Sequence, residues 1–343
     1  MESHEIHLVN KNRRPLKPLL PLEKPLSIFI EPSNMCNFRC APCVHGNELT
    51  RKCLEPFCNM EVSVFQRIAG EIKEWNGPKL NLMRLAVLGE PLVHPNFSEF
   101  VRIAKQMNIA DKVDTFTNAS LLNRDISEKL VEYQLDAIRV SIYSVIQERH
   151  DTITRTNFSI EKIRDNIRQL KDIRDKAGSK KPFIIVKAFD NYNEENELFI
   201  KLYSNIADET GFEKITNAAN YGDINLIDRY YGDQRKNKAT QEAYSKGLNE
   251  HIACPRPFMA LVINSAGDVL MCTQDSPKKT KIGSVYKQNL LDIWFGKELY
   301  EFRKIHLENE KHKNELCKNC DWYKLFPAED NVDGLAIEIF KSK

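Results

Sequence analysis

The chain has 343 residues, a length that suits one large domain with a smaller appendage. A hydrophobic fraction of 42% is enough for a sizeable core, and 50 Lys and Arg residues against 48 Asp and Glu residues leave the chain nearly neutral. This composition excludes wholesale disorder and gives no reason to expect nucleic acid or a membrane as a partner. No secretory signal or run of ~18–20 apolar residues is present. We therefore expect a cytoplasmic protein whose nine cysteines stay reduced and are in part metal ligands.

Strand and helix patterns alternate six times along the first two thirds of the chain, with no hairpin signal between them. The strands are predicted over residues 27–33, 80–91, 112–118, 136–143, 182–189 and 212–218. The helices between them are predicted over residues 62–75, 97–107, 125–134, 160–176 and 194–207. Such alternation predicts an α/β fold, a parallel sheet curled into a partial (β/α)6 TIM-type barrel. In barrels of this type the chemistry lies at the carboxyl ends of the strands.

The pattern changes near residue 254. Two short strands flank a turn at residues 264–268, and a helix is predicted over about 290–307. We therefore expect a second, smaller domain built from a hairpin and a helix. The predicted division is an N-terminal arm at 1–25, the barrel at 26–218, a polar linker at 219–253, the small domain at 254–323 and a tail at 324–343.

The first cysteine cluster follows the first predicted strand. Cys36, Cys40 and Cys43 have the spacing C-x3-C-x2-C, whereas zinc sites usually use C-x2-C or C-x4-C pairs and four ligands. Three thiolates on a [4Fe–4S] cluster leave one iron without a protein ligand, so that a small molecule can chelate it. The alternative is a zinc knuckle or three unrelated buried cysteines.

This spacing resembles the signature of the radical S-adenosylmethionine (SAM) superfamily. The resemblance implies that the open iron binds the amino and carboxylate groups of SAM. It also implies that an electron from the cluster, delivered by a flavodoxin- or ferredoxin-type donor, cleaves SAM. The resulting 5′-deoxyadenosyl radical then abstracts a hydrogen atom from a substrate.

Other segments resemble the superfamily in the same order, each at the end of a predicted strand. Gly89, Glu90 and Pro91 resemble its Gly-Gly-Glu-Pro turn, with Leu88 in place of the first glycine, and Asn118 lies in a segment similar to Thr-Asn-Gly-Thr. The resemblance implies that these residues hold SAM. Each also has an ordinary alternative as a turn residue.

Two further residues complete the set of SAM candidates. Ser141 resembles a fourth-strand serine that contacts SAM, and Arg155 resembles a partner of the SAM carboxylate, although its spacing differs by one residue. Pro42 departs from the family, in which the residue before the third cysteine is usually aromatic and lies beside the adenine.

A second set of four cysteines lies in the small domain. It could close a zinc site or ligate a second [4Fe–4S] cluster completely. The region resembles the SPASM extension of radical SAM enzymes. It is similar to the shortened form of this extension, called twitch, because no cysteine follows the last of the four. The four are Cys254, Cys272, Cys317 and Cys320.

The cysteine spacing is similar to that of the twitch-type 2-deoxy-scyllo-inosamine dehydrogenases. In that family the substrate radical loses a proton and an electron, so that an alcohol becomes a ketone. The resemblance therefore implies an auxiliary cluster that accepts an electron, whereas the alternative is a cluster that only braces the fold. The family resemblance extends over about residues 27–323.

Three residues outside these motifs are candidates for catalysis. Cys53 and Cys58 are surface thiols or, as in related epimerases, a hydrogen-atom donor near the SAM site. Lys187 lies on the fifth predicted strand. The alternatives for it are a contact with the substrate, a contact with SAM, or a structural role in which its aliphatic side chain covers the strand end.

The sequence thus favours a radical SAM oxidoreductase acting on a small polar substrate such as a sugar, cyclitol or nucleotide-sugar. The alternatives are a radical SAM enzyme that modifies or epimerises a peptide or protein, and a zinc-stabilised binding protein without catalysis. The 25 residues before the first strand are too few for the N-terminal recognition domain that peptide modifiers often carry.

Overall fold

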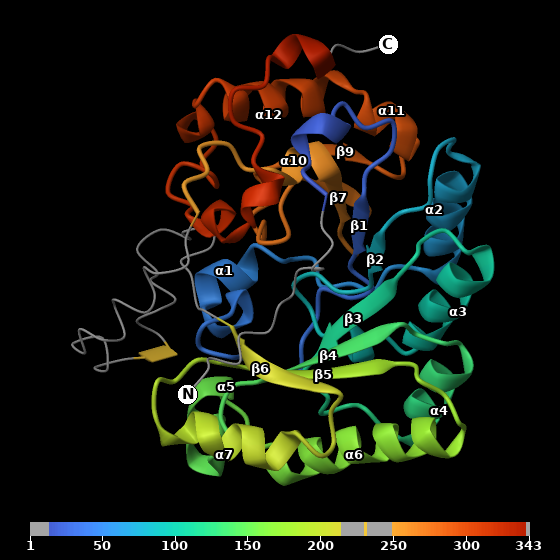
Figure 1. Cartoon of the computed structure of the whole chain (residues 1–343), viewed down its shortest axis with the longest axis vertical. Coiled ribbons are helices and arrows are strands. Elements are labelled where there is room, and N and C mark those ends of the chain that lie inside the picture. Colours follow the sequence, from blue (N-terminus) through green and yellow to red (C-terminus); the bar gives the residue numbers. More distant parts are fainter. Residues whose placement is uncertain (1–13, 214–229, 232–248, 341–343) are drawn as a thin grey trace.

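A single nine-stranded sheet organises the molecule. The computed structural model describes residues 14–213, 230–231 and 249–340. The strand order is β6-β5-β4-β3-β2-β1-β7-β8-β9, and β1 to β6 pair in parallel and in chain order. The sheet curves without closing (Figure 1), so the predicted partial barrel is confirmed. Its parallel strands are β1 Ser27–Ile30, β2 Leu82–Arg84, β3 Val113–Thr117, β4 Ala137–Ile142, β5 Phe183–Phe189 and β6 Glu209–Glu213.

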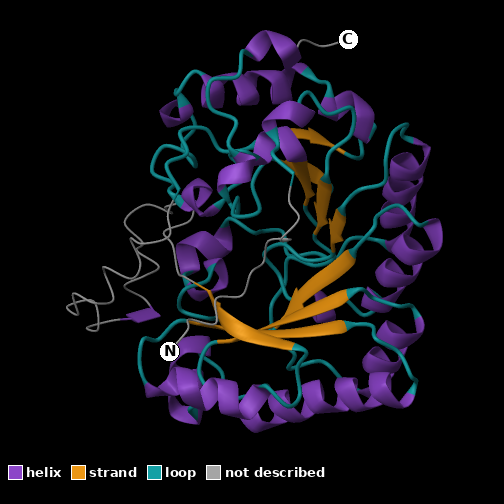
Figure 2. Cartoon of the chain, viewed as in Figure 1, coloured by secondary structure: helices purple, strands orange, loops and turns teal. Residues whose placement is uncertain are grey.

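Helices cover the outer face of the parallel part (Figure 2). Helix α6 shows why they form there: the Ser159 hydroxyl caps its first turn, and Ile163, Ile167 and Leu170 point into the core with helical spacing. Its bounds agree with those predicted. The helices of this region are α1 Glu48–Lys52, α2 Val62–Glu74, α3 Phe97–Met107, α4 Arg124–Glu132, α5 Gln147–Thr154, α6 Ile160–Lys176 and α7 Glu194–Tyr203.

The C-terminal region joins the same sheet instead of forming a separate one. Strand β7 pairs in parallel with β1, and β8 and β9 continue the sheet as antiparallel strands. The Trp294 indole also donates to the Leu22 carbonyl (3.0 Å), which ties the region to the segment before β1. Its elements are α10 Arg256–Met259, β7 Ala260–Ile263, β8 Asp268–Leu270, β9 Lys281–Ser284, α11 Leu290–Trp294 and α12 Lys297–Leu307.

Several element bounds differ from the prediction. Strand β2 has only three residues, because the chain leaves the ladder after Arg84 to form the turn that precedes Pro91. Strand β6 begins at Glu209, and the helix predicted over 290–307 is divided at Gly296, which has an extended backbone. Helix α5 and strand β9 were not predicted. The predicted stretch 214–218, most of the linker and the first half of the arm lie outside the described residues.

The apolar sides of the helices and strands meet in one main core. Its largest fully buried side chains include Phe65, Phe100, Phe199 and Trp294, which come from both the barrel and the C-terminal region. Among the described helices, none combines the length and apolar character needed to cross a membrane.

Candidate functional site

The loop with Cys36, Cys40 and Cys43 follows β1, at the carboxyl ends of the parallel strands. Helix α5 fixes this loop through its last carbonyls. The Arg39 N–H donates to the Thr154 carbonyl (3.0 Å), and the Ala41 N–H donates to the Ile153 carbonyl (2.7 Å). The loop is therefore held by the end of a helix that the sequence pattern did not reveal.

The turn after β2 packs directly on the cysteine loop. A Cβ at Gly89 would lie 2.0 Å from the Ser33 carbonyl oxygen, so only glycine allows this approach. The Glu90 N–H donates to the Met35 carbonyl (2.8 Å) and locks the contact. The structure thus brings the Gly-Glu-Pro turn beside the cysteines, as the strand-end positions suggested.

The Glu90 carboxylate joins this turn to the one after β3. It accepts from the Thr117 hydroxyl (2.7 Å), the Asn118 N–H (2.7 Å) and the Leu92 N–H (3.1 Å). The Asn118 amide in turn donates to the Asn37 side chain (2.9 Å) in the cysteine loop. Burial raises the pKa of Glu90 to about 7, against the effect of these three hydrogen bonds. Glu90 and Asn118 therefore belong to one network, buried at Glu90 and exposed at Asn37, that holds three loops together.

Ser141 lies near the carboxyl end of β4, and Tyr143 directly follows the strand. Ser141 is half-buried, and the Tyr143 hydroxyl lies near the Cys40 thiol. Arg155, at the end of α5, donates to the Gly46 carbonyl at the close of the cysteine loop. Arg155 thus contacts the cysteine loop, Ser141 lies near the carboxyl end of β4, and Tyr143 is an additional neighbour of the cysteines.

The three thiols fit the role of cluster ligands by their chemistry. Burial raises the pKa of Cys36 to about 12, and the nearby Glu90 and Cys43 add to this effect. Burial also raises the pKa of Cys40 and Cys43. Thiols that lie close together and are shielded from water ionise together only when a metal supplies positive charge.

The four C-terminal cysteines come from three separate segments and line one cavity. Cys254 precedes α10, Cys272 follows β8, and Cys317 and Cys320 follow α12. Burial raises the pKa of Cys254 to about 11 and also raises that of Cys272 and Cys317. Shared burial around one cavity is the arrangement that a bound metal group requires.

Four thiols around one cavity are a donor set that a zinc ion or a four-iron cluster can use. In the described ranges, no three or more His, Cys, Asp or Glu side chains are placed to hold one ion. Four thiolates at 2.3 Å from a zinc ion would have to stand roughly 4 Å from one another. A four-iron cluster spreads its thiolate ligands more widely, so the donor set fits the cluster.

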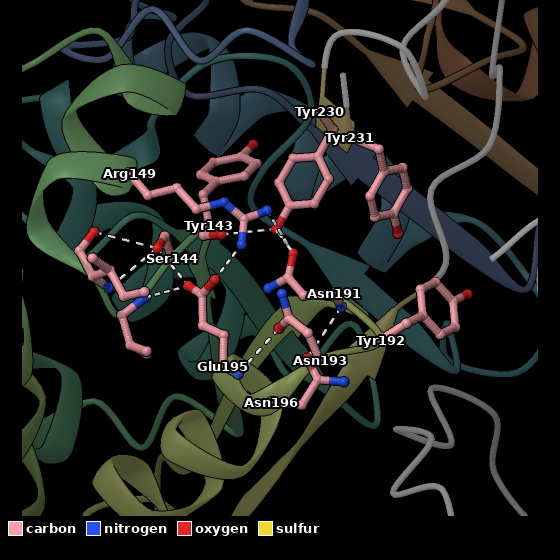
Figure 3. Close-up of polar contacts among 12 residues, drawn as sticks. Tyr143, Ser144, Arg149, Asn191, Tyr192, Asn193, Glu195, Asn196, Tyr230 and Tyr231 are labelled. Atoms are coloured by element: carbon pink, nitrogen blue, oxygen red, sulfur yellow. Dashed lines mark hydrogen bonds and ion pairs between the residues drawn. The ribbon is translucent and has the colours of Figure 1, made fainter. Parts of the chain in front are cut away.

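A polar network that the sequence did not predict lies beyond the ends of β4 and β5 (Figure 3). The Glu195 carboxylate of α7 accepts from the Ser144 hydroxyl and from Arg149, and Arg149 also donates to Asn191 (2.8 Å). The Tyr230 hydroxyl donates to the same Asn191 oxygen (2.9 Å). No motif marks these residues, because their contacts join segments that are distant in the sequence.

Aromatic rings continue the network toward the cysteine loop. The Tyr230 hydroxyl donates to the Tyr143 carbonyl (2.8 Å), and the Phe189 ring lies 5.1 Å from the Tyr230 ring. Since the Tyr143 hydroxyl also lies near the Cys40 thiol, Tyr143 lies between Tyr230 and the cysteine loop.

The remaining candidates lie in different surroundings. Lys187 is buried and pairs with Glu213 (2.6 Å), and its ammonium lies 4.6 Å from the centre of the Phe116 ring. Cys58 is half-buried and its sulfur lies 3.4 Å from the Ser265 hydroxyl, whereas Cys53 is exposed at the end of α1.

Two family models match this chain. The model of the radical SAM superfamily matches residues 30–197, and the SPASM model, described as an iron-sulfur cluster-binding domain, matches residues 254–321. The first contains Cys36, Cys40 and Cys43, and the second contains the four C-terminal cysteines.

Two relatives differ in how much of the chain they resemble. The tungsten-containing aldehyde ferredoxin oxidoreductase cofactor-modifying protein of Pyrococcus furiosus is 23% identical over 333 residues, 89% of each chain. The SAM-dependent 2-deoxy-scyllo-inosamine dehydrogenase of Niallia circulans is 34% identical over 71 residues, 21% of this chain and 28% of the relative.

Solved structures share the fold. The crystal structure of BtrN in complex with AdoMet and 2-DOIA has a TM-score of 0.55 at 17% identity, covering 87% of this chain and 93% of BtrN. Streptococcus suis SuiB bound to its precursor peptide SuiA has a TM-score of 0.64 at 17% identity, covering 89% of this chain and 73% of SuiB. Together with the two family models, these findings confirm the family that the sequence predicted: the chain is an enzyme of the radical SAM superfamily and carries a C-terminal SPASM domain.

Proposed function

We propose that the chain is a radical SAM oxidoreductase with two [4Fe–4S] clusters that oxidises a small polar substrate. Cys36, Cys40 and Cys43 would hold the cluster that binds SAM, and the four C-terminal cysteines would hold an auxiliary cluster, as in twitch domains. The observation that carries the proposal is the convergence of those four cysteines, from separate segments, on one cavity. Four thiolate ligands leave no iron open for a substrate, which suits electron transfer.

SAM and the first cluster would supply a 5′-deoxyadenosyl radical that takes a hydrogen atom from the substrate. After the resulting substrate radical loses a proton, the auxiliary cluster would accept the electron that remains. The chain's own residues would position SAM. We assign this role to Gly89, Glu90, Pro91, Asn118, Ser141 and Arg155. The Glu90 network supports the assignment, because it fixes three loops around the cysteines and leaves little freedom for them to move.

Charged side chains inside the barrel support a polar substrate. Arg84, Arg139 and Lys187 come from three strands, and the charged ends of all three lie within 6 Å of the centre of the Phe116 ring. Asp114 pairs with both arginines. A barrel interior lined in this way can offer hydrogen bonds and charge to hydroxyl or phosphate groups of a substrate.

The number of clusters is tested by iron analysis of protein reconstituted without oxygen. We expect about eight irons per chain, and about four after Cys36, Cys40 and Cys43 are all changed to Ala. Cys53→Ser is the matched control and should retain about eight. Stoichiometric zinc in a colourless protein would instead support a zinc-stabilised binding protein without catalysis.

The substrate is tested by stimulation of 5′-deoxyadenosine formation from SAM and dithionite. We expect sugars, cyclitols or nucleotide-sugars to stimulate it, and Cys40→Ala to abolish it. An oxidised product without consumption of a nicotinamide would establish the oxidoreductase. Stimulation by peptides alone contradicts this proposal.

A peptide or protein substrate is the second candidate. SuiB was solved with its precursor peptide, and its TM-score of 0.64 exceeds the 0.55 of BtrN. A peptide epimerase would also need a thiol that returns a hydrogen atom, for which Cys58, half-buried beside Ser265, is better shielded than the exposed Cys53. Incorporation of solvent deuterium into a peptide product, lost in Cys58→Ala, would favour this function.

The remaining assignments follow from the same chemistry. A flavodoxin- or ferredoxin-type protein would supply the first electron, and Lys187, which is paired with Glu213, would contact the substrate from β5. The boundaries proposed for the domains remain 26–218 for the barrel and 254–323 for the auxiliary domain. We place the protein in the cytoplasm, where its thiols would remain reduced.

A further inference from the structure

His306 presents an unused hydrogen-bond donor to the cavity of the four cysteines. This residue of α12 is 2% exposed and lines the cavity. Its Nδ1 accepts from the Cys254 N–H (3.4 Å), so the ring proton lies on Nε2. Within the described part of the chain, Nε2 is buried and has no hydrogen-bond partner. A buried N–H without a partner is costly, and this one faces a space that a ligand can fill.

Arg256 adds a buried positive charge to the same cavity. The residue lies two positions after Cys254, is 6% exposed and lines the cavity. Its guanidinium is held between aromatic rings, 4.5 Å from the centre of Trp322 and 5.0 Å from that of Phe29. Its Nε is also buried without a hydrogen-bond partner among the described residues. A buried cation in apolar surroundings is stabilised by a nearby anion.

An auxiliary cluster would supply an acceptor for His306 and, in addition to the buried Asp330, a negative charge near Arg256. A [4Fe–4S] cluster held by four thiolates is an anion and gains a further negative charge on reduction. Its sulfur atoms accept hydrogen bonds, and both such bonds and nearby positive charge favour the reduced form.

We propose that His306 and Arg256 are positioning residues that raise the reduction potential of the auxiliary cluster, His306 by donating its Nε2–H and Arg256 by its charge. The cluster thereby becomes a better acceptor for the electron that the oxidised substrate releases. This inference rests on the proposed auxiliary cluster, and it names the residues that fit that cluster for electron acceptance.

Arg303 provides a matched control. It is a buried arginine of the same helix as His306, 5% exposed, and its guanidinium lies 4.4 Å from the centre of the Trp294 ring. Its Nε donates to the Pro257 carbonyl (3.0 Å), and it does not line the cavity. Replacing Arg303 therefore removes a buried guanidinium that does not itself line the cavity.

The test is an anaerobic redox titration monitored by electron paramagnetic resonance. The full chain carries Ala at positions 36, 40 and 43, so that only the auxiliary cluster gives a signal. We expect His306→Leu and Arg256→Met each to make reduction about tenfold less favourable, a fall of about 59 mV for one electron. His306→Gln and Arg256→Lys, which keep a donor and a charge, should recover most of the potential, and Arg303→Met should leave it unchanged.

The outcomes separate the two proposals. A chain without the first three cysteines that binds no cluster overturns the auxiliary cluster and this inference together. A cluster whose potential is the same in His306→Leu, Arg256→Met and the starting protein overturns the inference alone. If one variant fails to assemble the cluster, its iron content will show this. The potential of the other variant, compared with that of the conservative substitution at the same position, then tests the inference.

Discussion

The Glu31 carboxylate accepts hydrogen bonds from both the N–H (3.2 Å) and the hydroxyl (3.3 Å) of Ser265, although 234 residues separate them. Glu31 directly follows β1 and is 3% exposed, and it also accepts from the Leu88 N–H (3.0 Å). One buried carboxylate thus joins the turn beside the proposed SAM site to the hairpin turn of the SPASM domain.

Glu31→Gln should destabilise the protein by about 1–3 kcal/mol, because an amide NH2 group would face donors that now bond to a carboxylate. Thermal unfolding of the reconstituted protein, followed by circular dichroism, measures the loss. Glu99→Gln is the matched control, since Glu99 pairs with Arg102 on the surface, and its unfolding temperature should barely change. Equal effects of both changes would show that the link between the turns is not important for stability.

Asp114→Asn should destabilise the protein by about 3–5 kcal/mol, because the buried Arg139 and the partly buried Arg84 lose their counter-ion. Burial by itself would raise the pKa of Asp114, but Arg84 and Arg139 lower it overall. A carboxylate with a lowered pKa stabilises the folded state above its ordinary value near 3.9 and loses this effect only as pH falls through the lower value.

The difference in stability between the wild type and Asp114→Asn should therefore stay constant from pH 8 to pH 5. Denaturant unfolding at several pH values measures it. Asp125→Asn, which breaks a surface pair with Lys129, serves as the control and should have little effect at any pH. A difference that shrinks between pH 7 and pH 5 would mean that the arginines do not hold Asp114 ionised.

Gly89→Ala should prevent normal assembly of the first cluster. The new methyl group would lie 2.0 Å from the backbone oxygen of Ser33, so either the turn or the cysteine loop must move. Iron content after reconstitution should fall toward the four irons of the auxiliary cluster. Gly70→Ala, in the middle of α2 with no atom within 4 Å of the added carbon, should bind iron normally and be more stable by up to ~1 kcal/mol.

Asn118→Ala should weaken SAM binding roughly fivefold, which corresponds to about 1 kcal/mol for the lost hydrogen bond to Asn37. Equilibrium dialysis of SAM with the reconstituted protein measures the affinity. Asn123→Ala removes the cap of α4, away from the cysteine loop, and should lower stability without changing SAM affinity. If both variants bind SAM like the wild type, Asn118 does not organise the site.

The sequence by itself determined the chemistry and the alternation of elements. The spacing of the cysteines at 36, 40 and 43 can be read directly from a short stretch of sequence. The apolar pattern that predicted the observed bounds of α6 can be read in the same way, because helix periodicity is set by residues three and four apart. The family resemblance added the turns after β2 and β3, whose residues the structure joins through Glu90.

Only the tertiary structure decided how distant segments meet. The pairing of β7 with β1, the bond between Glu31 and Ser265 and the contact of Tyr230 with Tyr143 each join residues far apart in the chain. A sequence pattern does not encode such pairings locally, since they depend on the curvature of the whole sheet. For the same reason, the four C-terminal cysteines could be counted from the sequence, whereas the arrangement of His306 and Arg256 around their cavity emerged only from the fold.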